Sequence, residues 1–70
     1  MSVFPNLTHR EDEVLILIAK GYRNKEIADN LKISVYTVQN HIQDLFRKIG
    51  VRNRTEAARK YWEKKITLLK

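Results

Sequence analysis

The segment from Ser34 to Gly50 constrains the fold most, because both of its ends carry helix-boundary signals. Ser34 can cap the start of a helix with its side-chain oxygen, and Gly50 can end one in the left-handed conformation. The sequence therefore predicts a helix over residues 35–49, about four turns long. Apolar residues recur along it at spacings of three and four: Val35, Val38, Ile42, Leu45, Phe46 and Ile49. We expect this stripe to pack against other helices.

The opposite face of the predicted helix is polar. Its members are Tyr36, Gln39, Asn40, Gln43 and Arg47. Amides, a phenolic hydroxyl and a guanidinium can all hydrogen-bond to base edges in the major groove of DNA. We therefore interpret residues 35–49 as a DNA-reading helix. The pattern alone leaves a second interpretation open, in which these side chains form only a solvated helix face.

Length and composition limit the class of protein. A chain of 70 residues forms one small domain, whose stability alone is modest. The absence of cysteine excludes disulfides and thiolate metal sites, and no apolar run has membrane-spanning length or the form of a secretory signal. We accordingly expect a cytoplasmic protein. Helix formers dominate and Pro5, Gly21 and Gly50 are the only strong breakers, which favours an all-α fold.

The positive charge is concentrated in the second half of the chain. Residues 1–31 contain four Lys or Arg and five Asp or Glu, whereas residues 32–70 contain ten and three, within a net charge of +6. The basic excess therefore lies on and after the predicted DNA-reading helix. Neutralisation of phosphates supplies much of the sequence-independent affinity of DNA-binding proteins. The asymmetry suits a polyanionic partner, although a solvated basic surface would have the same composition.

Two further helices precede the segment already described. Residues 1–6 are predicted to form an N-terminal arm, and residues 7–70 the domain. Thr8 and Glu11 have the spacing of a capping box, so a first helix should start there and end at Gly21. A second, shorter helix is expected to open at Arg23 or Asn24. Its tight connection to residues 35–49 predicts a helix-turn-helix.

A fourth helix is predicted after Gly50. Asn53 is its expected cap, with Glu56 three residues later. Its apolar members are Ala57, Ala58, Tyr61, Trp62, Ile66 and Leu69. The fold class is therefore all-α, a four-helix bundle that contains a helix-turn-helix.

Four segments of the chain together resemble the LuxR-type helix-turn-helix DNA-binding domain. They are Leu7–Leu15, Gly21–Ala28, Ser34–His41 and Lys48–Ala57, in the order and spacing of that family. The resemblance covers roughly residues 7 to 66. It implies a four-helix DNA-binding domain of a bacterial transcription regulator that binds double-stranded DNA, commonly as a homodimer, and associates with the nucleoid. RNA polymerase is a further candidate partner, and no cofactor is implied.

The resemblance also implies roles for individual residues. Gln39, Asn40 and Gln43 match the positions that approach base edges. Positions that usually meet phosphates are matched by Lys25, Tyr36, Thr37, Arg47 and Arg54, with Lys48 as a further candidate. The last helix often forms the symmetric subunit contact, which here would use Tyr61, Trp62 and Ile66. Lys64 and Lys65 replace the usual glycine stop, so we expect this helix to continue past Ile66.

The sequence also allows other interpretations. The promoter-reading helix-turn-helix of a sigma factor shares the capping box and the Ser-x-x-Thr-Val run, but the segment from Val51 to Ala57 favours the LuxR type. The chain could instead be a protein-interaction module that sequesters a related regulator through its last helix. We expect no enzyme, because the sequence contains no nucleophile–base pair, phosphate-binding glycine loop or metal cluster. His41 is interpreted as a packing or phosphate-side residue.

Overall fold

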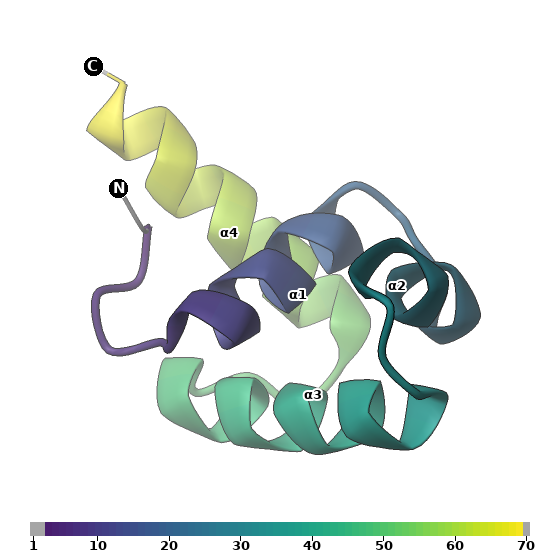
Figure 1. Ribbon diagram of the computed structural model, residues 1–70. Helices are drawn as coiled ribbons and strands as arrows, with labels where there is room; N and C mark the ends of the chain where they lie inside the picture. Colours follow the sequence, from purple (N-terminus) through teal and green to yellow (C-terminus); the bar gives the residue numbers. More distant parts are fainter. Residues whose placement is uncertain (1–2, 70) are drawn as a thin grey trace.

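Four α-helices make up the computed structural model, which describes residues 3–69 (Figure 1). They are α1 (His9–Ala19), α2 (Asn24–Leu31), α3 (Val35–Ile49) and α4 (Arg54–Leu68). No strand occurs within residues 3–69, so the predicted all-α four-helix fold is confirmed. None of these helices is long and apolar enough to cross a membrane.

The first helix, α1, lies at the centre and contacts each of the other three (Figure 1). Its predicted capping box is present: the Thr8 N–H donates to Glu11 Oε1 over 2.9 Å, and the Glu11 N–H donates to Thr8 Oγ1 over 3.1 Å. At the other end the amides of Gly21 and Tyr22 donate back into the last turn, and Gly21 has a φ of 91°. Because a glycine adopts this conformation without steric cost, α1 ends there as expected.

The helix-turn-helix consists of α2, residues 32–34 and α3. Asn24 is the first helical residue of α2, and Glu26 accepts a hydrogen bond of 2.7 Å from the Arg23 N–H. Arg23 itself supplies no side-chain cap, because a guanidinium has no acceptor. After Leu31 the chain turns through Lys32 in the left-handed conformation, φ 58°. That turn places α3 directly against α2.

The third helix begins and ends where the sequence predicts. Val38, Leu45 and Ile49 are fully covered by the bundle, and Ile42 and Phe46 are half-buried. The expectation for Val35 was wrong, since its side chain is exposed. Val35 stands at the first position of α3 and at the edge of the apolar stripe, where fewer neighbours cover it.

The last helix, α4, is capped by Asn53 Oδ1, which accepts from the Glu56 N–H over 2.9 Å. It continues to Leu68, past Ile66 as expected. Only its first half is packed into the core, through residues such as Ala57 and Tyr61. Its last turns extend beyond the body of the bundle (Figure 1), so Ile66 and Leu69, predicted as apolar members of a packed face, are exposed.

The residues before α1 pack against the bundle. Phe4 and Leu7 are buried in the core, and the Leu7 N–H donates to the Phe4 carbonyl over 3.1 Å. The Asn6 side-chain amide donates to the Lys48 carbonyl at the end of α3. No sequence pattern predicted a core role for Phe4. Residues 1 and 2 of the predicted arm lie outside the described residues, and the arm–domain boundary at residue 6 stays a prediction.

Candidate nucleic-acid interface

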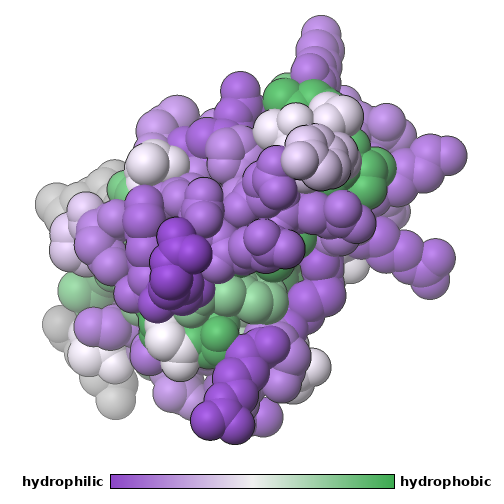
Figure 2. All heavy atoms as spheres, turned by 90° about the horizontal axis from the view of Figure 1, so that it is seen from below, coloured by the Kyte–Doolittle hydropathy of each residue, from purple (hydrophilic) through white to green (hydrophobic). Residues whose placement is uncertain are grey.

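The outer face of α3 is open to solvent. Gln39, Asn40 and Gln43 are exposed, and Tyr36 is 71% exposed. None of the three amides forms a side-chain hydrogen bond within residues 3–69. Figure 2 views the molecule from the side of α3, and that face is mostly hydrophilic. The amide groups predicted to read bases therefore point away from the core with their donors and acceptors unused.

The start of α3 is fixed by its cap. Ser34 Oγ accepts from the Thr37 N–H over 3.0 Å and lies 2.9 Å from Thr37 Oγ1. This cap satisfies one amide of the first turn. The remaining free amides of a helix N-terminus favour anions, because they donate along the direction of the helix dipole. At this end of α3 the side chain of Tyr36 is exposed, whereas Thr37 is half-buried.

Arg47 stands on the same outer face of α3, more than two turns after Thr37. Its Nη2 lies 2.9 Å from Asp44 Oδ1, and the side chains of Arg47 and Asp44 are 73% and 49% exposed. The guanidinium is thus accessible but already has an anionic partner. Asp44 was not among the predicted site residues, although the spacing of three residues on a helix brings such side chains together.

Lys48 has an internal partner of a different kind. Its Nζ lies 2.7 Å from Glu11 Oε1, and the Glu11 side chain is only 5% exposed. This pair joins the start of α1 to the end of α3. The ammonium therefore compensates a buried carboxylate, which limits its freedom to move toward a phosphate.

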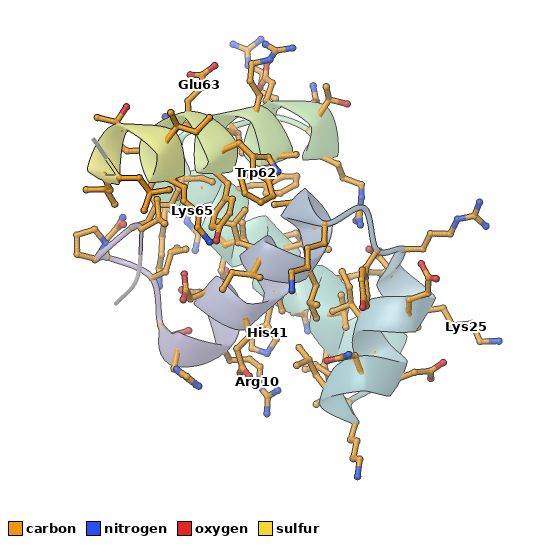
Figure 3. The ribbon with its side chains drawn as sticks, turned by 90° about the horizontal axis from the view of Figure 1, so that it is seen from above. Arg10, Lys25, His41, Trp62, Glu63 and Lys65 are labelled. Carbon is orange, nitrogen blue, oxygen red and sulfur yellow. The ribbon has the colours of Figure 1, made fainter. Side chains whose placement is uncertain are left out.

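The same holds for Arg54, at the start of α4. Its two terminal nitrogens donate to the Asn24 side-chain oxygen and to the Tyr22 carbonyl, which ties α4 to the first residue of α2 and to the loop before it. Lys25, by contrast, is exposed on the first turn of α2 and forms no ion pair within the described part of the chain; it points into solvent in Figure 3. The four predicted phosphate-binding cations thus differ in availability, from Lys25 through Arg47 to Lys48 and Arg54.

The Glu11 carboxyl has a perturbed pKa. Burial raises this pKa, but hydrogen bonds from Lys48 and Thr8 and the Lys48 charge together outweigh burial, so the pKa lies below the usual 4.5. A carboxyl with a lower pKa in the folded chain stabilises the fold fully above its unfolded-state pKa. That contribution is lost as pH falls through the folded-state pKa.

We therefore expect the free energy of unfolding to decrease as pH is lowered below about 4.5, with a contribution from Glu11. Urea denaturation between pH 3 and pH 7 measures it. Glu11→Gln should flatten the pH dependence, because the amide does not titrate, while other carboxylates contribute equally to both chains. Parallel curves for the two chains would contradict the assignment.

The residues predicted as a subunit contact fall into two groups. Tyr61 is buried, and Trp62 Nε1 donates to the Ala19 carbonyl over 3.1 Å, with the two rings in edge-to-face contact. Lys65 Nζ lies 5.6 and 5.7 Å from the centres of these rings, and Figure 3 shows Trp62 and Lys65 on the side of α4 that faces α1. Ile66 is exposed, together with Leu68, which sequence analysis did not name. Trp62 is nevertheless 42% exposed, so the apolar surface available to a partner comprises part of the Trp62 ring and the end of α4.

A four-helix domain with a helix-turn-helix, whose second helix presents unused amides beside exposed cations, has the architecture of a major-groove DNA-binding domain. Comparison with known protein families identifies the class of DNA-binding domain. The family model for bacterial regulatory proteins of the luxR family matches residues 5–61. The chain belongs to this luxR family of DNA-binding regulatory proteins, as its sequence motifs indicated.

Individual relatives agree with the family assignment. The chain is 46% identical over 55 residues to the response regulator protein VraR of Staphylococcus aureus (strain Mu3), and equally to the VraR proteins of Staphylococcus saprophyticus and Staphylococcus epidermidis. The matched segment covers 79% of this chain and 26% of each relative. The chain thus spans about a quarter of the length of these proteins.

Proposed function

We propose that this chain binds double-stranded DNA sequence-specifically by inserting α3 into the major groove, and that it does so as a dimer to regulate transcription in the cytoplasm. The observation that supports this most is the row formed by Gln39, Asn40 and Gln43, exposed and without hydrogen-bond partners in residues 3–69. Asn and Gln amides can each pair bidentately with adenine. Unpaired amides on a rigid helix are therefore ready to select base pairs.

Contacts with the sugar-phosphate backbone would set orientation and affinity. The side chains proposed for these contacts are Lys25 on α2 and Arg47 near the end of α3, both exposed, with exposed Tyr36 and half-buried Thr37 at the start of α3. Side chains of these types position a helix in the groove without reporting sequence. We assign smaller shares to Lys48 and Arg54, because each already has a partner inside the domain.

Selection of duplexes from a random pool tests the proposal directly. We expect enriched sequences with two inversely repeated half-sites, since a two-fold dimer places two copies of α3 in successive grooves. Absence of any enrichment, with no duplex bound at low salt, would contradict the proposal. If a related regulator then co-purified with the chain, the alternative function, sequestering of that regulator through α4, would be supported instead.

Two substitutions separate the proposed roles. Asn40→Ala should remove discrimination at one base pair, by about 1–3 kcal/mol, and leave binding to unrelated duplexes unchanged. Lys25→Ala should weaken selected and unrelated duplexes by similar factors and reduce the dependence of affinity on salt by about one ion. Titrations of both variants against both duplexes, over a salt series, measure this. Identical profiles for the two variants would contradict the division of roles.

The proposed dimer contact uses the exposed end of α4. Ile66, Leu68 and Leu69 expose apolar surface there, which an isologous pair of helices would cover. Each copy carries a net charge of +6, so two copies also repel each other. We therefore expect DNA to promote pairing, and sedimentation equilibrium with and without a selected duplex measures the number of chains in each state.

The relatives suggest the wider context. They are described as response regulators, and the matched segment is about a quarter of each. We propose that this chain supplies the DNA-binding function of a comparable regulator. RNA polymerase is a candidate partner of the chain when the chain is bound to DNA.

A further inference from the structure

We propose that the ring of Tyr36 is a base-reading group, which contacts the 5-methyl group of a thymine at the start of α3 and so adds to the sequence preference set by the amides. The inference rests on the proposed function. It gives Tyr36 a contact that depends on sequence, in addition to the contact of its hydroxyl with the sugar-phosphate backbone.

Tyr36 lies in the middle of the outer face of α3. Tyr36, Asn40, Gln43 and Arg47 follow one another at spacings of four, three and four residues, and all four are exposed. Side chains at these spacings point to the same side of a helix. Tyr36 is therefore aligned with two of the three amides, and it lies one helical turn before Asn40.

The Tyr36 ring contributes little to the core. Its side chain is 71% exposed and forms no hydrogen bond, ring contact or cation–π contact within residues 3–69, whereas Tyr61 is buried. Most of the apolar surface of the Tyr36 ring is therefore in contact with water, and a partner can cover it. Because a tyrosine has only two rotatable side-chain bonds, holding the ring in one position costs little entropy.

The position of Tyr36 along α3 indicates which DNA groups the ring meets. In helix-turn-helix proteins the N-terminal residues of the second helix contact base edges, and Tyr36 is the second residue of α3. Thymine presents its 5-methyl group in the major groove, on the side of the base nearest its own strand's backbone. A side chain whose hydroxyl meets a phosphate of that strand can place its ring against the methyl group.

The ring and the amides read different features of a base pair. Amide side chains pair with the N6 and N7 atoms of adenine, whereas apolar groups contact the methyl group of thymine. On the outer face of α3 the other residues are amides and a guanidinium, so Tyr36 supplies the extended apolar group of this face. A methyl contact distinguishes thymine from cytosine, which adds information that an adenine contact does not supply.

Replacing single thymines of the selected duplex by deoxyuridine tests the inference, because this change removes only the 5-methyl group. We expect one position in a half-site at which the unsubstituted chain loses affinity about three- to fourfold, the value for one methyl group covered from water. This position should lie one or two base pairs from the pair that Asn40 reads. One helical turn spans about 5.4 Å, and one base-pair step about 3.4 Å.

Three variants identify the residue that contacts the methyl group. In Tyr36→Ala the deoxyuridine effect should fall below about 1.5-fold, because the ring is absent. Tyr36→Phe keeps the ring and should retain the effect in full, whatever affinity the hydroxyl supplies. Val35→Ala is the matched control: it truncates the adjacent exposed apolar side chain, which points about 100° away around α3, and should also retain the effect. Urea unfolding of Tyr36→Ala should match that of the unsubstituted chain.

Several results would overturn the inference. One is a selected duplex in which no deoxyuridine lowers the affinity of the unsubstituted chain. Another is an effect of full size in Tyr36→Ala, which would assign the methyl contact to another residue. Loss of the effect in Tyr36→Phe or Val35→Ala would also contradict a contact made by the Tyr36 ring. If the unsubstituted chain binds no duplex at low salt, the proposed function itself fails, whereas binding without a methyl effect overturns only this inference.

Discussion

Replacing Lys48 by Met is expected to lower the free energy of unfolding by about 2–3 kcal/mol, a large fraction of the stability of a 70-residue domain. The Lys48 ammonium is the ionic partner of Glu11, whose side chain is 5% exposed. Without it, Glu11 keeps one hydrogen bond from the Thr8 N–H, but its charge is buried without compensation. A methionine of similar length preserves the packing of the alkyl stem and isolates the charge effect.

Thermal and urea unfolding measure this loss, and for a domain of this size it corresponds to a decrease in Tm of roughly 10–20 °C. Lys25→Met is the matched control, because Lys25 is exposed and forms no ion pair within residues 3–69. The double variant with Glu11→Gln should recover part of the loss, since removing both charges leaves no unpaired carboxylate. If Lys48→Met unfolds within about 0.5 kcal/mol of the unsubstituted chain, the pair has no such structural role.

The helix bounds were accessible from sequence because local chemistry determines them. Thr8, Ser34 and Asn53 each supply a side-chain acceptor to an amide three residues later, as predicted. Gly21 and Gly50 take positive φ at the ends of α1 and α3. The end of α2 lacked such a marker, because Lys32 adopts the left-handed conformation without being a glycine.

The contacts between distant residues were not accessible in this way. Lys48 pairs with Glu11 across 37 positions, Arg54 reaches Asn24 at the start of α2 across 30, and the Trp62 indole donates to Ala19 across 43. Each depends on how the helices pack, which periodicity does not specify. For the candidate site, exposure of the amide row followed from the helical period, whereas the distinction between available and occupied cations depends on contacts between distant residues.

The two faces of α3 should separate stability from sequence preference, and Leu45→Ala tests the inner face. Leu45 has no exposed surface and packs in the core, so truncation leaves a cavity and should cost about 2–5 kcal/mol of unfolding free energy. Because the folded fraction then decreases, apparent affinity for DNA falls on all duplexes by that fraction, while the preference among duplexes is retained.

Asn40→Ala on the outer face of the same helix provides the comparison. The Asn40 side chain is exposed and forms no hydrogen bond within the described residues. The unfolding free energy of the variant should therefore change by less than about 0.5 kcal/mol, while discrimination at one base pair is lost. Urea unfolding measures the stability of each variant, and titration with selected and unrelated duplexes measures the discrimination that each variant retains. A packing defect in the core should weaken binding to every duplex by the same factor. If Leu45→Ala instead lost discrimination among duplexes without losing stability, the buried stripe and the amide row would not act independently.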